Sequence, residues 1–198
     1  PCSLSELLQD TYRSIAPQAS DKDVAFSMDS SRLIHGDVLC DQEKLRQILL
    51  YLLDNAVTYT PGGGRVVLSA AELESLPNDY AVYQFIVEDT GIGIGKDFLG
   101  HIFEPFEREK NTTFSGVHGS GLGLTIARNT VRQMSGTIDV TSRVGQGSIF
   151  TVTLRLQVLK QPSSPLPEHE VTLEQLLGRT LLLVEDNELN LEIETDLL

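Results

Sequence analysis

Three residues at the end of an apolar run, Asp89, Gly91 and Gly93, have types and spacing that suit ligand binding. The run before them, residues 82–87, is rich in β-branched and aromatic residues, which predicts a strand that enters a core. Glycine permits positive φ and lets another backbone or a ligand come close. A carboxylate beside such a turn can accept a hydrogen bond from an exocyclic amine, such as that of adenine. By itself, the same spacing is also typical of an ordinary strand-to-loop turn.

A second candidate is a glycine-rich segment that opens a predicted helix running to about residue 134. Its residues are Gly119, Ser120, Gly121, Leu122, Gly123 and Leu124. Glycines at a helix start expose several N–H groups toward one point, and the helix dipole adds partial positive charge there. The segment therefore predicts an anion site, although the glycines alone could also serve close packing.

A third candidate is Asn55, near the end of a helix predicted over residues 41–60 with Asp41 as its N-cap. Leucines, isoleucine and alanine at helical spacing predict its buried face, and Asn55 falls at the edge of that face. An amide oxygen there can ligate a hard cation such as Mg²⁺. The alternative is an ordinary solvated asparagine.

Other elements must position these residues. The pattern predicts a helix over 4–15, a strand within 21–28, antiparallel strands over 65–73 and 80–88, a short helix over 96–103, and a hairpin of 136–143 with 147–156. Residues 107–118 lack apolar periodicity and have the length of a mobile lid. A connector without function is the alternative.

Composition excludes some classes of function. The chain has 198 residues, 40% of them hydrophobic, and a formal net charge of −13, which argues against a nucleic-acid surface. Cys2 and Cys40 lack metal-ligand spacing and are expected to be free thiols. No run approaches the ~20 apolar residues of a membrane span. The abrupt ends lead us to expect a fragment of a longer protein.

The C-terminal part has a different character. Residues 158–178 are rich in proline and serine and predict a linker. Residues 180–184 form a continuous apolar run typical of a buried parallel strand, which ends in Glu185 and Asp186. Paired acids at such a strand end suit Mg²⁺, or they are a solvated turn.

Four features occur together in one order: Asn55 on a helix, Asp89-x-Gly91-x-Gly93 after a strand, Phe103-x-Pro105-Phe106 before the predicted lid, and Gly119-x-Gly121-x-Gly123 after it. Over roughly residues 1–157 this resembles the catalytic and ATP-binding domain of bacterial sensor histidine kinases, in the ATPase superfamily of gyrase, the ninety-kilodalton heat-shock protein and MutL. Residues 179–198 look like the start of a doubly wound receiver domain, which implies a hybrid kinase.

The resemblance implies a role for individual positions. Asn55 would hold Mg²⁺, Tyr59 would lie against adenine, and Asp89 would bind the adenine amino group, with Gly91, Gly93, Ile94 and Phe106 around it. Arg108 would approach the phosphates, the N–H groups of 119–124 would meet them, and Thr151 would lie behind the adenine pocket. Glu185 and Asp186 would hold Mg²⁺ in an intact receiver.

Two positions depart from the family's pattern. Tyr51 stands where asparagine is common, and Thr58 stands where lysine or arginine is common. Related ATPases have a glutamate at the position of Tyr51, and tyrosine is a poor general base for activating water. We therefore expect slow hydrolysis and phosphoryl transfer to another group.

The resemblance predicts an α/β two-layer sandwich with a mixed, mainly antiparallel sheet and three main helices on one face. The expected domains are 1–157, a linker at 158–178, and the receiver start at 179–198. Expected partners are ATP with Mg²⁺, an upstream dimerisation hairpin with the acceptor histidine, and the receiver, in a homodimeric, membrane-bound sensor whose cytoplasmic portion includes this chain. No contact of the chain with nucleic acid or membrane is expected. The alternatives are a degenerate nucleotide-binding scaffold and a hydrolytic ATPase of the same superfamily.

Overall fold

The computed structural model describes residues 1–107 and 121–159. The chain divides into two units between Gln161 and Pro162, and all described residues belong to the first. The predicted receiver strand, with Glu185 and Asp186, lies outside the described residues. In chain order the elements are β1 (Cys2–Ser3), α1 (Leu4–Asp21), β2 (Ala25–Arg32), β3 (Asp37–Leu39), α2 (Gln42–Tyr59), β4 (Arg65–Leu76), β5 (Tyr80–Asp89), α3 (Lys96–Leu99), α4 (Gly123–Gln133), β6 (Thr137–Arg143) and β7 (Gly147–Val158).

The strands form one mixed sheet in the order β1-β3-β7-β5-β4-β2, with β6 also paired to β7. Only the β2–β4 pair is parallel among the described strands, and all other pairs are antiparallel. The predicted mixed, mainly antiparallel sheet is confirmed. The long β5–β7 ladder places Asp89 opposite Ser148 at one end and Tyr80 opposite Gln157 at the other.

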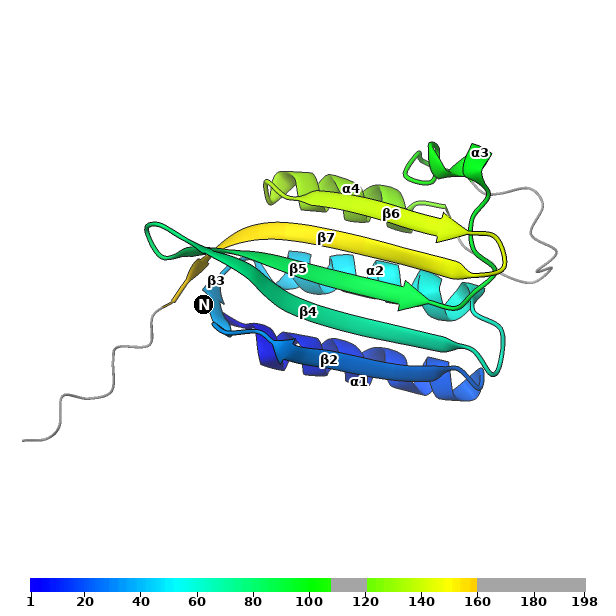
Figure 1. Cartoon of the computed structure of the whole chain (residues 1–198), viewed down its shortest axis with the longest axis horizontal. Helices are drawn as coiled ribbons and strands as arrows, with labels where there is room; N and C mark the ends of the chain where they lie inside the picture. The colour runs from blue at the N-terminus through cyan, green and yellow to red at the C-terminus, as the bar shows by residue number, and fades with distance from the viewer. Residues whose placement is uncertain (108–120, 160–198) are drawn as a thin grey trace, which may run out of the picture. The chain divides into compact units, whose positions relative to one another are not determined.

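Helices α1, α2 and α4 lie together behind the sheet in Figure 1, as predicted for the three main helices. Side chains of a strand alternate between its two faces, and β5 follows this rule closely. Tyr83, Phe85, Val87 and Asp89 are buried, whereas the residues between them are half-buried. The core therefore lies between the helices and one face of the sheet, and Asp89 is the last buried position of β5.

Helix α2 has the features that its sequence predicted. The Asp41 side chain accepts a hydrogen bond from the Lys44 N–H at 3.1 Å, which caps the helix start. At the other end, Lys22 Nζ donates to the carbonyls of Val57, at 2.9 Å, and of Thr58. These carbonyls belong to the last turn, where helices have no internal donors left. The predicted buried face is confirmed for Leu45, Ile48, Leu49, Leu52, Leu53 and Ala56.

Several boundaries differ from the prediction. Helix α1 runs to Asp21 instead of residue 15, because Ala19 extends the buried face past Pro17. Helix α3 ends at Leu99 instead of residue 103, since Gly100 follows it and turns continue to Phe106. Strands β1 and β3 were not predicted, because runs of two and three residues carry no readable period.

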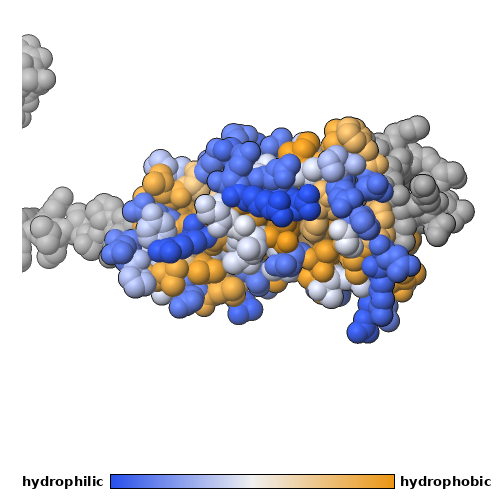
Figure 2. All heavy atoms as spheres, turned by 90° about the horizontal axis from the view of Figure 1, so that it is seen from above, coloured by the Kyte–Doolittle hydropathy of each residue, from blue (hydrophilic) through white to orange (hydrophobic). Residues whose placement is uncertain are grey.

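The described surface is mixed in character. On the side shown in Figure 2, hydrophobic residues lie among hydrophilic ones. Cys2 and Cys40 are free thiols, as predicted. In the part of the chain that the structure describes, no helix is long and apolar enough to cross a membrane.

Candidate functional site

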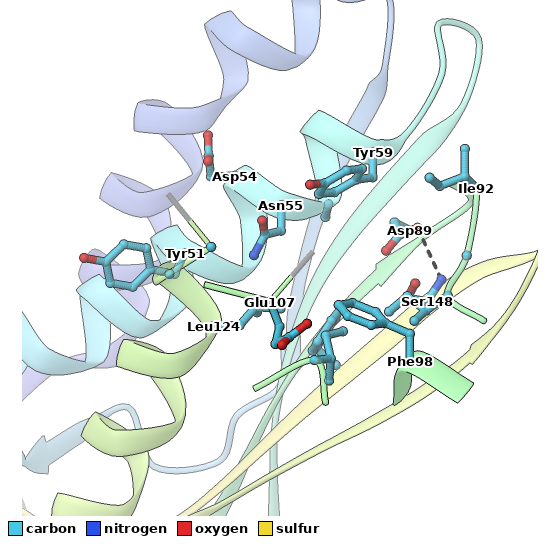
Figure 3. Close-up of a pocket in the computed structure, with 17 residues that line it drawn as sticks. Tyr51, Asp54, Asn55, Tyr59, Asp89, Ile92, Phe98, Glu107, Leu124 and Ser148 are labelled. Carbon is cyan, nitrogen blue, oxygen red and sulfur yellow. Dashed lines mark hydrogen bonds between the residues drawn. The ribbon is translucent and has the colours of Figure 1, made fainter. Parts of the chain in front are cut away.

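A pocket of 240 Å³ lies where α2, the end of β5 and the start of α4 meet (Figure 3). Its walls come from distant parts of the sequence, which is why the fold is needed to assemble it. The lining residues are Tyr51, Asp54, Asn55, Ala56 and Tyr59 of α2, Asp89, Ser148 and Phe150 of the sheet, Ile92, Gly93, Ile94, Phe98 and Ile102 of the segment after β5, and Glu107, Gly121, Gly123 and Leu124.

Asp89 lies at the base of this pocket and is 6% exposed. Its Oδ1 accepts hydrogen bonds from the Gly91 N–H at 2.8 Å and the Ser148 N–H at 3.2 Å. Within residues 1–107 and 121–159, no hydrogen bond is made to Oδ2. The two backbone donors therefore fix the carboxylate through one oxygen and leave the other for a donor in the pocket.

The electrostatic state of Asp89 follows from these contacts. Burial raises the pKa of the Asp89 carboxyl above its ordinary value, because the charged form loses water. The hydrogen bonds from Gly91 and Ser148 act in the opposite direction, and the nearby Glu88 adds to the increase in pKa. A ligand that donates a hydrogen bond to Asp89 would replace part of the lost hydration.

The two glycines after Asp89 are required by close backbone contacts. A Cβ on Gly91 would lie 2.6 Å from the carbonyl oxygen of Tyr59, and a Cβ on Gly93 would lie 2.0 Å from that of Arg143. Gly93 also has a φ of +68°, which side chains disfavour. The prediction that these glycines permit close approach is confirmed, with the end of α2 and the β6–β7 hairpin as the approaching backbones.

Asn55 and Tyr59 project from α2 one turn apart, and both are half-buried. The Asn55 side chain makes no hydrogen bond to the described part of the chain, so its amide is available to a ligand. The Tyr59 carbonyl accepts from the Ile92 N–H at 3.2 Å, which ties α2 to the loop after β5. Tyr59 is thereby placed beside the base of the pocket.

Helix α4 begins at Gly123 on the opposite wall. The Gly121 carbonyl accepts from the Phe106 N–H at 3.2 Å, so the two described ends of the segment between them meet. The Tyr51 ring packs against Gly123, where a Cβ would lie 3.1 Å from Tyr51 Cδ1. Tyr51 lies at the other end of the pocket from Asp89 and Ser148 (Figure 3).

Comparisons with known proteins identify the family to which this fold and pocket belong. Residues 40–158 match the model of the family described as histidine kinase-, DNA gyrase B-, and HSP90-like ATPase. The chain belongs to this ATPase family.

Relatives within the ATPase family are sensor kinases. The chain is 37% identical over 194 residues to the autoinducer 2 sensor kinase/phosphatase LuxQ of Vibrio parahaemolyticus, covering 96% of the chain and 22% of LuxQ. It is 32% identical over 193 residues to the sensor histidine kinase GacS of Pseudomonas protegens, covering 96% of the chain and 20% of GacS. The chain thus spans about a fifth of these relatives.

A solved structure agrees with this placement. The crystal structure of full-length ShkA in complex with AMPPNP matches with a TM-score of 0.68 and 30% sequence identity, over 82% of this chain and 32% of that chain. The described domain is a histidine kinase ATP-binding catalytic domain, as the sequence motifs predicted.

The structure brings most of the predicted residues of this ATPase domain into one pocket. Asn55, Tyr59, Asp89, Gly93, Ile94, Gly121, Gly123 and Leu124 all line it. Gly91 packs behind Asp89, and Leu122 does not line the pocket. Arg108, Gly119 and Ser120 lie outside the described residues.

Two other predicted positions are not among the lining residues of the pocket. Thr151 pairs with Ile86, and its side chain takes the other face of the sheet, whereas its neighbour Phe150 is buried and lines the pocket. Phe106 also does not line the pocket. Its φ of +63° turns the chain, and the residue is 73% exposed.

Sequence reasoning missed several residues of the ATPase pocket. Ser148 is the most informative, because its N–H holds Asp89 and its Oγ lies 3.0 Å from that of Ser142. Phe98 and Ile102 supply an apolar wall, and Glu107 brings a carboxylate to the pocket. Asp54 also lines the pocket, while its Oδ1 accepts a hydrogen bond from Gln18 Nε2 at 3.0 Å. The alternation in β7 was readable, but its phase relative to Asp89 required the strand register.

Proposed function

We propose that this domain binds ATP with Mg²⁺ in the pocket and delivers the γ-phosphoryl group to a histidine elsewhere in the protein. The observation that carries the proposal is Asp89, whose carboxylate is fixed through Oδ1 by two backbone donors at the base of the pocket. Its Oδ2 can accept a hydrogen bond from the adenine amino group. Phe98 and Ile102 give the ring an apolar wall, and Tyr59 lies beside it.

The start of α4 supports the proposed binding of the phosphates. The eleven residues of this helix start at Gly123, next to Gly121 with a φ of +68°. The N–H groups and dipole of a helix start favour anions. In this proposal the N–H groups from Gly121 to Leu124 meet the phosphates, and Arg108, Gly119 and Ser120 contribute to the same group of contacts.

The donor set fits a magnesium ion that is bound mainly by phosphates and water. Asn55 offers one amide oxygen that the described residues leave without a hydrogen bond, and Mg²⁺ prefers oxygen ligands and keeps several waters. When bound, the ion would neutralise phosphate charge. Asn55 would orient the triphosphate, and the carboxylate of Glu107, which also lines the pocket, adds to the need for such neutralisation.

The pocket favours phosphoryl transfer over hydrolysis. Tyr51 packs its ring on Gly123, and its Oη accepts a long hydrogen bond of 3.4 Å from Gln47 Nε2. A phenol is a poor general base for activating water near neutral pH. Transfer to an acceptor instead needs mainly positioning and charge neutralisation. A degenerate domain that serves only as a scaffold is the competing function.

The wider assembly belongs to the same proposal. The acceptor histidine would lie on an upstream dimerisation hairpin, which makes the whole protein a homodimer. Residues 179–198 would begin a receiver domain, with Glu185 and Asp186 at its Mg²⁺ site, in a hybrid kinase whose cytoplasmic portion includes this chain. The relatives support this reading because they are sensor kinases several times longer than the chain.

Calorimetric titration with a non-hydrolysable ATP analogue, with and without Mg²⁺, tests the proposal. We expect binding that Mg²⁺ strengthens. Asp89→Asn should weaken it by roughly 1–3 kcal/mol, because the amide cannot accept as the carboxylate does and one buried hydrogen bond is lost or weakened. Thr151→Ala, on the other face of the sheet, is the matched control and should bind normally. Absence of binding at millimolar nucleotide would establish the scaffold function instead.

A further inference from the structure

Phe103 is held at three points by residues from two sides of the pocket. Its carbonyl accepts a hydrogen bond from Thr125 Oγ1 of α4 at 3.0 Å. The guanidinium carbon of Arg128, one turn further along α4, lies 5.5 Å from the centre of its ring. The same ring makes a T-shaped contact with the ring of Phe150 of β7, with centroids 6.5 Å apart and planes at 85°. Phe103 therefore connects α4 with the floor of the pocket.

The two elements joined in this way belong to different ends of the proposed nucleotide site. Thr125 directly follows Leu124, the last residue of the glycine-rich segment that begins α4, and this segment forms the phosphate end. Phe150 and Ile102 belong to the apolar wall at the adenine end of the pocket. A connection between them fixes the distance from the adenine contacts to the phosphate contacts.

Thr125 is suited to this task by its burial. It is 7% exposed, and its hydroxyl donates to the backbone of Phe103 and not to its own helix. A threonine in a helix commonly bonds back to the carbonyl four residues earlier. The hydroxyl of Thr125 instead fixes the start of α4 against a segment outside the helix.

We propose that Thr125 is a positioning residue, which holds the phosphate-binding start of α4 at a set distance from the adenine end through Phe103. The inference rests on the proposed nucleotide binding. Binding is tighter when contact groups are held in place beforehand, because less ordering is needed on association. Removing the hydroxyl should therefore weaken ligands that contact both ends of the pocket, and leave ligands that contact only the adenine end.

The test compares two ligands and three variants. Affinities for the non-hydrolysable ATP analogue with Mg²⁺ and for adenosine are measured by titration, on the whole 198-residue chain. Thr125→Val removes the hydroxyl and keeps the shape, whereas Thr125→Ser restores the hydroxyl. Thr130→Val is the matched control, because Thr130 is also a buried threonine of α4 but is not bonded to Phe103.

We expect Thr125→Val to lower the affinity for the ATP analogue about three- to ten-fold, the range for one lost hydrogen bond. Adenosine affinity should be unchanged, and Thr125→Ser and Thr130→Val should bind both ligands like the wild type. Equal losses for the two ligands, or no loss for the ATP analogue, would overturn the role of Thr125 while nucleotide binding stands. A wild-type chain that binds neither ligand would overturn the proposed function and this inference together.

Discussion

Asp89 places a negative charge where only 6% of the residue remains exposed. Burial raises its pKa in the folded protein, and the hydrogen bonds from Gly91 and Ser148 offset this only in part. A carboxyl with a raised folded pKa stabilises the fold below its ordinary pKa, and this contribution is lost as the pH rises through the raised value. At neutral pH the charge that suits ligand binding therefore lowers the stability of the ligand-free domain.

We expect Asp89→Asn to be more stable than the wild type at pH 7, although it binds nucleotide less well. The difference should disappear near about pH 3, where the wild-type carboxyl is also neutral. Urea unfolding of both proteins at the two pH values measures this. A difference that does not change with pH would show that the charge of Asp89 is not its cause.

Glu72 of β4 shows the opposite balance. Its side chain is 1% exposed, and burial raises its pKa, but hydrogen bonds from the His35 N–H, His35 Nδ1 and Ser75 together outweigh this effect. The net pKa is lowered. Such a carboxyl stabilises the fold above its ordinary pKa, and the contribution is lost as the pH falls through the lowered value.

Glu72→Gln should accordingly lower the free energy of unfolding at pH 7 by about 1–3 kcal/mol, the range for hydrogen bonds to a charged group. The loss should shrink in acid, where the wild-type carboxyl is neutral too. Urea unfolding beside Asp89→Asn gives an internal control, since the two variants should shift stability at pH 7 in opposite directions. The same sign for both would contradict the assigned electrostatic roles.

The residues that chemistry singles out were readable from the sequence, but their neighbours were not. Asp89, Asn55 and the glycines have distinctive types and spacing, so their shared pocket could be predicted. Ser148 and Thr151 both lie in one alternating strand, and only the pairing of Asp89 with Ser148 decides which face each takes. A one-residue change in register exchanges the two faces, which is why the face of Thr151 could not be read from its own strand.

At the level of elements, α2 carries the most of the site, because five of its residues line the pocket. Its start is capped by the Asp41 side chain, which accepts a hydrogen bond from the Lys44 N–H. Its end is held by Lys22 from the end of α1. The position of Asn55 and Tyr59 therefore depends on contacts at both ends of the helix.

Asp41→Ala should lower the free energy of unfolding by about 0.5–2 kcal/mol, the usual cost of losing an N-cap. Asp41→Ser keeps an oxygen acceptor and should lose much less. Because Asp41 is distant from Asn55 along the helix, nucleotide affinity should be nearly unchanged in both variants. Thermal or urea unfolding gives the stability, and the same titration gives the affinity. An Ala variant as stable as the wild type would mean that the cap is not needed.

Long elements were predicted well and short ones poorly, for a physical reason. Helix α2 and strand β5 each contain several buried apolar residues at regular spacing, so the sequence shows the helical or strand period clearly. Strand β1 is formed by pairing with β3, and β3 by pairing with β1 and β7, so neither strand has a pattern of its own. Helix α3 stops at Gly100 although apolar residues continue, because those residues pack as turns against the pocket.

For the molecule as a whole, all the described residues that line the pocket belong to the first unit, Pro1–Gln161. A chain that ends at Gln161 should therefore fold and bind the ATP analogue with the affinity of the 198-residue chain, within about two-fold. Circular dichroism and calorimetry check the two parts of this prediction. A large loss of affinity in the shortened chain would show that residues 162–198 contribute to binding.

The topology of the sheet was less predictable than its class. The family resemblance indicated a mixed sandwich, and the apolar pattern indicated an antiparallel pair of strands over 65–73 and 80–88. The parallel pairing of β2 with β4 joins segments separated by α2 and β3, and no local signal specifies it. Long-range pairing of this kind is decided by the assembled core.

The short strand β3 gives the domain a particular mechanical behaviour. Val38 pairs with Cys2 on one side and with Val158 on the other, at the end of the sheet away from Asp89 and Ser148. A pulling force applied between residues 2 and 158 would therefore load these few pairs first and open them one after another. The Asp89–Ser148 end of the β5–β7 ladder would be loaded last. Tension in the surrounding protein would therefore separate the β1–β3 and β3–β7 pairs before it distorted the pocket.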